Sequence, residues 1–294
     1  MSWDSHIRSD PFKGFFCSLV GTVLFSIAYV IAKYGLEGFN QETFSLVWAS
    51  AAAIYSLAIV LATSGWQQLT LPAHAVSTIA LIGLLTGAGM ILSWAGLARL
   101  DPSFAGFLWR FAPVLTIVLG ALYLGERLLV GELVPIAIMV LGGCLGAIGR
   151  WHIVGVGMAL TLLACCAFAV QLLIAKMQVA RIHSVILNFY RVGIGALIIA
   201  LWTLLTGKVD FNVEASYWLV TLLGAFLGPC TGFLLTFRSY RHWDLSRSSI
   251  VLTVQPLFIL PSAYFIIGQL PTGMELIGGS MILAGAFWLA WIHR

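Results

Sequence analysis

The chain has 294 residues, of which 61% are hydrophobic and only 9% are charged, whereas about 25% of the residues of an ordinary soluble domain carry a charge. This composition excludes a soluble domain and predicts an integral membrane protein. The formal net charge of +4 indicates membrane topology and gives no reason to expect nucleic-acid binding.

Apolar segments of about 20 residues, the length that a helix needs to cross the hydrocarbon core, follow one another along the chain. We expect ten transmembrane helices, at residues 13–34, 43–63, 74–98, 102–124, 128–149, 154–177, 184–206, 215–240, 245–267 and 272–292. Short connections rich in glycine, proline and other turn residues separate them. The polar N-terminus and the long first apolar segment differ from a cleaved signal peptide, so we expect the first helix to be retained.

The second half of the chain repeats the first at a constant offset of 143 residues. Residue types that are rare in this chain fall on the offset: Lys33 and Lys176, Asp101 and Asp244, Pro113 and Pro256, and Glu132 and Glu275. We therefore predict two five-helix repeats, at residues 1–149 and 150–294. Because five is odd, the second repeat enters the membrane from the opposite side. Inverted repeats of this kind hold a substrate site near the membrane midplane, which favours a transporter over a pore.

Positive charges are distributed unevenly between alternate connections, with nine lysines and arginines on the side of the N-terminus and four on the other side. Because the more positive connections stay in the cytoplasm, we expect both termini to be cytoplasmic. All five cysteines fall inside predicted helices, where we interpret them as small packing residues. Neither a disulfide, a metal site nor a cofactor is predicted.

The fourth helix of each half shares a further pattern. It contains a proline near its middle and ends in a Gly-Glu or Gly-Gln turn, and a glycine-rich helix follows; the two copies run from Pro113 to Gly125-Glu126 and from Pro256 to Gly268-Gln269. This arrangement resembles the drug/metabolite transporter superfamily, and within it the exporters built from two EamA domains. The resemblance implies a bacterial inner-membrane protein with a central cavity lined by the first, third, fourth, sixth, eighth and ninth helices.

Two shorter features resemble the bacterial aromatic amino acid exporters of this superfamily. They are residues 51–56, Ala-Ala-Ala-Ile-Tyr-Ser, and the tryptophan-containing segment just before Pro113. Two positions depart from the symmetry of the halves: Trp48 stands opposite Arg191 in the repeat, and Glu126 opposite Gln269. Strictly symmetric roles are therefore not expected there.

Arg110 is predicted near the middle of the fourth helix. A guanidinium at that depth costs at least about 2.5–3.5 kcal/mol unless a wet cavity or a partner receives it. It either faces the cavity and attracts a substrate carboxylate as a planar fork, or it bonds to carbonyls freed by Pro113. The two interpretations remain equally weighted on the sequence.

Other residues complete the candidate site. Trp94 and Trp109 lie deep enough to form an apolar pocket, and four side chains are candidates for its polar groups: Ser26, Gln171, Thr253 and Gln255. Pro113 and Pro256 each remove a backbone hydrogen bond, so they are either bending points for gating or simple packing kinks.

Three basic residues lie nearer the helix ends. We expect Arg191 to extend, or snorkel, to the cytoplasmic surface, with an inward-pointing gate residue as the alternative. Lys33 and Lys176 are expected to snorkel too.

Groups used for energy coupling are missing from the sequence. No predicted helix contains a buried carboxylate or a mid-membrane histidine, and there is no phosphate-binding Gly-Lys-Ser/Thr motif. No matched nucleophile and base or metal ligands point to an enzyme. We therefore expect facilitated efflux by alternating access.

The expected substrate is a small molecule, an amino acid or a similar amphipathic metabolite, with aromatic amino acids favoured, and the expected functional unit is a monomer in the lipid bilayer. The alternatives are a multidrug or organic-cation exporter, against which Arg110 argues, and a channel or lipid scramblase, from which saturable, selective flux would separate a carrier.

Overall fold

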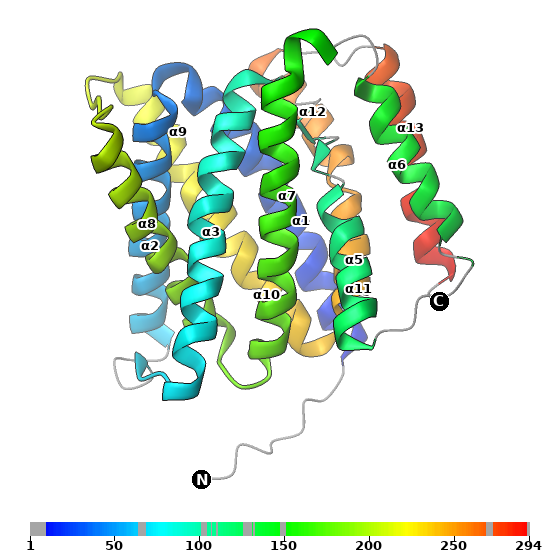
Figure 1. Ribbon diagram of the computed structural model, residues 1–294, viewed down its shortest axis with the longest axis horizontal. Coiled ribbons are helices and arrows are strands. Elements are labelled where there is room, and N and C mark those ends of the chain that lie inside the picture. The colour runs from blue at the N-terminus through cyan, green and yellow to red at the C-terminus, as the bar shows by residue number, and fades with distance from the viewer. Residues whose placement is uncertain are drawn as a thin grey trace.

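The computed structural model describes residues 10–63, 69–100, 105–106, 108–109, 111–125, 131, 133–147, 151–268 and 273–292. These parts are helical and contain no strand, as predicted (Figure 1). The first repeat contributes α1 (Pro11–Gly38), α2 (Gln41–Thr63), α3 (Ala73–Arg99), α5 (Phe111–Leu124) and α6 (Leu133–Ala147). The second contributes α7 (Trp151–Val179), α8 (Ser184–Thr206), α9 (Ala215–Ala225), a π-helix (Phe226–Gly232), α10 (Phe233–His242), α11 (Leu245–Thr253), α12 (Pro256–Ile267) and α13 (Gly273–Ile292).

The described helices account for the ten predicted spans. Seven continuous helical segments are long and apolar enough to cross a membrane, with α9, the π-helix and α10 counting as one and α11 and α12 as another. Shorter apolar helices at Phe111–Leu124, Leu133–Gly142 and Leu276–Gly285 supply the fourth, fifth and tenth spans. The helices stand side by side, and α6 and α13, the last helices of the two repeats, pair at one edge of the molecule (Figure 1).

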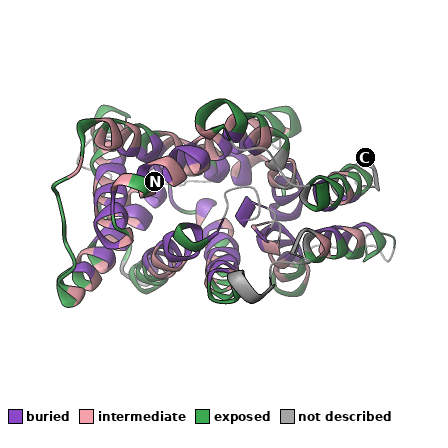
Figure 2. Cartoon of the chain, turned by 90° about the horizontal axis from the view of Figure 1, so that it is seen from above, coloured by how far each residue is buried: buried purple, intermediate pink, exposed green. Residues whose placement is uncertain are grey.

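The outer surface is apolar, which identifies lipid as the surrounding solvent. Seen from above, buried residues gather between the helices and exposed ones face outward (Figure 2). Large apolar side chains lie among the exposed ones, including Leu204 at 76% and Phe265 at 82% of their full exposure. Such surfaces are unfavourable in water and fit the hydrocarbon core of a bilayer.

Lys33 and Lys176 do not snorkel. The ammonium group of Lys33 donates to the carbonyls of Leu97 and Leu100 at 3.0 Å each, at the C-terminal end of α3. Lys176 likewise donates to two carbonyls at the end of α10, at 2.8 and 2.7 Å. The expectation of snorkelling was wrong because each ammonium group binds helix-terminal carbonyls within the protein. A helix C-terminus carries unpaired carbonyls and a partial negative charge, which a nearby ammonium group satisfies.

The fourth span of each repeat is interrupted just before its proline. Ala112 N–H bonds to the Trp109 carbonyl (3.2 Å), and Gln255 N–H bonds to the Leu252 carbonyl (3.3 Å). Both bonds join residues three apart, a tighter turn than the α-helix makes. The chain then resumes as α5 and α12, and each of these ends at a glycine with positive φ, Gly125 (66°) and Gly268 (73°), a conformation that glycine adopts without strain. The fourth and ninth spans therefore break and end in the same way at equivalent positions of the two repeats.

The eighth span is one continuous helical segment at Ala215–His242, which confirms the span predicted at residues 215–240, but it is not a regular α-helix throughout. It consists of α9, the seven-residue π-helix around Pro229, and α10. π-Helical turns are rare and often occur at functional sites. This one lies beside the central cavity.

Candidate functional site

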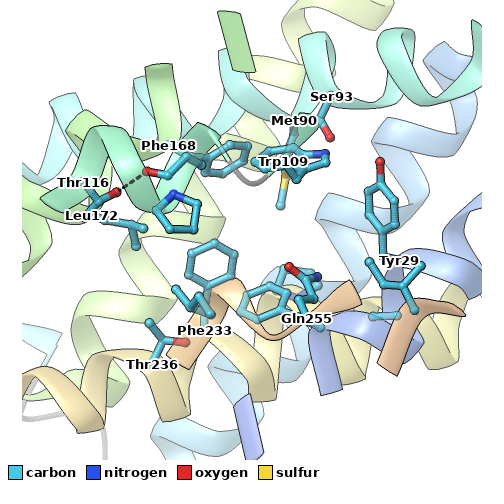
Figure 3. Close-up of a pocket in the computed structure, with 18 of the residues that line it drawn as sticks. Tyr29, Met90, Ser93, Trp109, Thr116, Phe168, Leu172, Phe233, Thr236 and Gln255 are labelled. Carbon is cyan, nitrogen blue, oxygen red and sulfur yellow. Dashed lines mark hydrogen bonds between the residues drawn. The ribbon is translucent and has the colours of Figure 1, made fainter. Parts of the chain in front are cut away.

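A cavity of about 140 Å³ lies between the two repeats. It is lined by residues of the first, second, third, fourth, sixth, eighth and ninth spans: Phe25, Ala28, Tyr29, Trp48, Met90, Ser93, Trp94, Trp109, Ala112, Pro113, Thr116, Phe168, Leu172, Gly228, Pro229, Phe233, Thr236, Leu252, Gln255 and Ile259. Figure 3 shows labelled side chains from both repeats around the same space. The second span, through Trp48, joins the six that the family resemblance implied.

The lining follows the internal repeat. Fourteen of its residues form seven pairs separated by 143 positions: Phe25 and Phe168, Tyr29 and Leu172, Met90 and Phe233, Ser93 and Thr236, Trp109 and Leu252, Ala112 and Gln255, and Thr116 and Ile259. Equivalent residues can line one cavity only where the two copies face each other. The cavity therefore lies on the pseudo-two-fold axis, where carriers with inverted repeats bind their substrates.

Aromatic rings form much of the wall. Phe233 meets Phe25 edge-to-face with ring centroids 4.6 Å apart, and Trp109 lies 5.5 Å from Phe168. Trp48 and Trp94 are in edge-to-face contact at 5.1 Å. These separations lie in the range that aromatic pairs prefer, so the cavity offers ring faces and edges to a ligand.

The cavity lining carries three indole donors together with side chains that can both donate and accept, those of Tyr29, Ser93, Thr116, Thr236 and Gln255. The indole N–H groups of Trp48, Trp94 and Trp109 are buried and have no acceptor among the described residues. The hydroxyls of Thr116 and Thr236 already donate to carbonyls of their own helices, at 2.8 and 3.0 Å. Since a buried donor without an acceptor is unfavourable, the site favours a ligand that carries oxygen acceptors. The described lining contains no carboxylate, histidine, lysine or arginine.

The structure brings together part of the set predicted from sequence. Trp94, Trp109, Pro113 and Gln255 line the cavity. Arg110 lies outside the described residues, and so does the side chain of Thr253. Pro256 is the first residue of α12, but its side chain is likewise not described.

Ser26 and Gln171 are buried behind the lining. The Ser26 hydroxyl donates to the Thr22 carbonyl at 2.7 Å and lies 3.3 Å from the Gln255 carbonyl, at the break of the ninth span. Gln171 is fully buried on α7, and neither atom of its amide has a partner among the described residues. Neither side chain reaches the cavity in this conformation.

The snorkelling predicted for Arg191 is wrong. Its side chain is fully buried and points toward the π-helix, where Nη2 donates to the Pro229 carbonyl at 2.8 Å and Nε donates to Asn188 Oδ1 at 3.1 Å. The guanidinium carbon lies 3.6 Å from the centre of the Phe233 ring. Carbonyls freed by the π-helix give the guanidinium partners inside the protein, so it has no need of the surface.

A buried carboxylate also departs from expectation. Glu42 lies in the first turn of α2 and is 5% exposed, with Lys208 Nζ 3.9 Å from its carboxylate. An acidic residue is favourable at a helix N-terminus. Glu42 does not line the cavity, so the expected absence of proton coupling stays a prediction.

Several lining residues escaped the sequence analysis, above all Tyr29, Met90, Phe233 and Pro229. The internal repeat links two of them, because Phe233 lies 143 positions after Met90. Pro229 was a proline inside a predicted span and should have predicted a break in the eighth helix as Pro113 did in the fourth.

The chain is similar to known transporters over most of its length. The sequence model described as the EamA-like transporter family matches residues 12–147 and 155–291. A probable terminal-alkyne amino-acid exporter of Streptantibioticus cattleyicolor is 23% identical over 278 residues, which cover 93% of this chain and 92% of that protein. An uncharacterized transporter of Archaeoglobus fulgidus is 26% identical over 221 residues, covering 75% and 77%. A crystal structure with 17% identity has the same fold, with a TM-score of 0.74 over 95% of this chain and 96% of the other.

Proposed function

The chain belongs to the EamA-like transporter family, and on that premise we propose that it exports amino acids, aromatic ones above all, or similar amphipathic metabolites. The observation that carries the proposal is the aromatic cavity on the pseudo-two-fold axis, with three indole donors that lack acceptors among the described residues. Its apolar walls suit a ring, and its donors suit the oxygens of a carboxylate.

The size of the cavity supports a single aromatic ring as the part of the substrate that is bound deepest. An apolar cavity of about 150 Å³ is known to hold a benzene molecule, and this cavity measures about 140 Å³. The amino acid backbone then extends toward the indole donors. An additional contact from Arg110 to the carboxylate is part of the proposal, since a guanidinium in the fourth span binds carboxylates as a planar fork.

The relatives support the amino acid class in one respect. The Streptantibioticus protein is named as a probable exporter of an amino acid with a terminal alkyne. An organic cation fits the site less well, because the described lining offers no carboxylate to pair with a positive charge. The described lining comes from both repeats and surrounds the pseudo-two-fold axis, which favours a carrier over a continuous pore.

The proposed mechanism is alternating access in a bacterial inner membrane, with both termini in the cytoplasm and one chain as the functional unit. The broken fourth and ninth spans, with Pro113 and Pro256 at equivalent places, are the proposed bending points. Transport runs down the substrate gradient, because the described cavity has no side chain that would carry a proton at neutral pH.

The test is release of labelled phenylalanine from proteoliposomes that contain the purified protein, with no ion gradient imposed. We expect saturable release that excess tryptophan inhibits and that Arg110→Ala abolishes. Release that does not saturate would indicate a channel or scramblase, and no release above protein-free liposomes would contradict either the aromatic substrate or uncoupled transport.

A further inference from the structure

The π-helix at Phe226–Gly232 presents backbone carbonyls to α8. Pro229 lies inside it and has no N–H group, and the wider turn shifts the bonding pattern of its neighbours. Two of its carbonyls, those of Pro229 and Cys230, accept hydrogen bonds from side chains of α8. The irregular segment is therefore held from outside, by a neighbouring helix.

Asn188 and Arg191, one turn apart on α8, act together in these contacts. The Asn188 amide donates to the Cys230 carbonyl at 3.0 Å and to the Pro229 carbonyl at 3.3 Å. Arg191 Nη2 donates to the same Pro229 carbonyl at 2.8 Å, and Arg191 Nε donates to the Asn188 side chain at 3.1 Å. The amide and the guanidinium thus form one connected network that ends on the π-helix.

The guanidinium also supports a wall of the cavity. It stacks 3.6 Å from the centre of the Phe233 ring, within the range of a strong cation–π contact. Phe233 lines the cavity and packs against Phe25. The position of this wall therefore depends on a residue that does not itself line the cavity.

Trp48, the residue equivalent to Arg191 in the first repeat, also contacts the π-helix. The Trp48 ring contacts Gly228 of the π-helix, where a Cβ atom would lie 3.5 Å from it, and packs more closely on Gly224 of the adjoining α9, where a Cβ atom would lie 2.4 Å away. Trp48 also lines the cavity. One repeat position thus contributes two different side chains, an indole and a guanidinium, to one π-helix.

The π-helix and Arg191 depend on each other, because the buried charge of Arg191 needs the carbonyls of the π-helix. No carboxylate of the described residues lies within ion-pair distance of it, and its Nη1 has no partner there. A fully buried guanidinium is unfavourable without hydrogen-bond acceptors. The carbonyls available to it are those of the π-helix, so a regular helix in this place would leave Arg191 without them.

We propose that Arg191 is a positioning residue that holds residues 226–232 in the π-helical form and thereby fixes Phe233 at the cavity. When its bonds to the π-helix break, the segment loses its π-helical pattern and keeps only the kink that Pro229 imposes. That change rotates Phe233 about the axis of the eighth span and opens the cavity wall. The consequence for transport rests on the proposed function, whereas the consequence for the π-helix does not.

Cys230 provides a direct reporter, because it lies in the π-helix and is fully buried. In a variant with the other four cysteines replaced by alanine, we expect N-ethylmaleimide to modify Cys230 slowly. Adding Arg191→Met, which retains bulk but removes the donors, should accelerate the modification at least tenfold. Arg191→Lys keeps the charge and an ammonium group that can donate, but not the planar fork of the guanidinium, and should fall between the two.

Two controls separate this effect from general loosening. Thr203→Val changes a buried polar residue of α8 whose hydroxyl donates within its own helix, and it should leave the modification of Cys230 unchanged. A parallel variant that retains only Cys165, equally buried on α7, should react at the same rate with Arg191 or Met. Equal acceleration at Cys165, or an unchanged rate at Cys230 in folded Arg191→Met protein, would overturn the proposal.

Phenylalanine release by the same variants separates the two proposals. If the original protein releases no phenylalanine but Arg191→Met still exposes Cys230 selectively, the proposed function fails and the role of Arg191 stands. If the protein transports phenylalanine and Arg191→Met changes neither the KM for release nor the rate of Cys230 modification, the role of Arg191 is refuted and the proposed function stands. Where Arg191→Met does not fold, Arg191→Lys carries the same comparison.

Discussion

Lys33 and Lys176 make the same contact in opposite halves of the protein, each donating to two carbonyls at the end of the third helix of its own repeat. The carbonyls themselves are also 143 positions apart, those of Leu97 and Tyr240 and those of Leu100 and Trp243. A contact preserved in both repeats, whose side chains elsewhere differ, indicates that it stabilises the five-helix unit rather than the transport site.

Replacing either lysine should therefore affect stability more than transport. Lys33→Met or Lys176→Met leaves helix-terminal carbonyls without their cation, a loss of about 1–3 kcal/mol. We expect the thermal unfolding temperature of the detergent-purified protein to fall by several degrees. Lys13→Met is the control, because Lys13 is exposed and its ion-pair partner among the described residues is Asp10, three positions away; an equal fall for Lys13→Met would contradict this role.

The indole donors should matter for affinity. Changing Trp94 or Trp109 to phenylalanine keeps an aromatic ring in the cavity but removes an N–H group. A hydrogen bond contributes about 0.5–1.5 kcal/mol, so we expect the KM for phenylalanine release to rise about twofold to tenfold.

Two comparisons test the origin of that effect. Trp218→Phe, outside the cavity and packed on Phe39, should leave the KM unchanged. Inhibition by phenethylamine, which lacks the carboxylate, should be the same with and without the indole N–H. A larger loss for phenethylamine than for phenylalanine would show that the donors do not bind the carboxylate.

The broken fourth and ninth spans should set the rate of transport. Pro256→Ala restores a backbone N–H and favours a continuous helix across the break. We expect the maximal rate of release to fall at least fivefold while the KM changes little, since binding precedes the bend. Pro261→Ala in the same helix is the control, and an equal effect at Pro261 would assign the loss to helix stability in general.

Flux should not depend on a proton gradient. The described lining of the cavity has no group that titrates near neutral pH, and Glu42 lies away from it in the first turn of α2. An imposed pH gradient of one unit should leave the initial rate of phenylalanine release within about twofold, with or without Glu42→Gln. A steep dependence on the gradient that Glu42→Gln removes would establish proton coupling through that residue.

The sequence predicted the elements well because hydrophobic length and the internal repeat determine them directly. The spans, the two copies and the symmetric breaks at Pro113 and Pro256 all follow from residue type and spacing. The predictions that were wrong concern the direction in which basic side chains point. Snorkelling is the usual behaviour of an arginine near a helix end, and only the freed carbonyls of the π-helix turn Arg191 inward.

The candidate site was predictable in part. Trp94, Trp109 and Gln255 were recognised as deep aromatic or polar residues. Ser26 and Gln171 met the same criteria but do not line the cavity, because depth along a helix does not determine the face on which a side chain lies. Applying the offset of 143 to Trp109 would have added Leu252 to the set.

The central claim is that the cavity between the repeats binds the substrate. Titration calorimetry of the purified protein with phenylalanine tests this, with Ala112→Phe as the variant that fills the cavity from the break of the fourth span. We predict saturable binding at one site for the original protein and none for Ala112→Phe that remains folded. Equal binding by both proteins would place the substrate elsewhere and contradict the account.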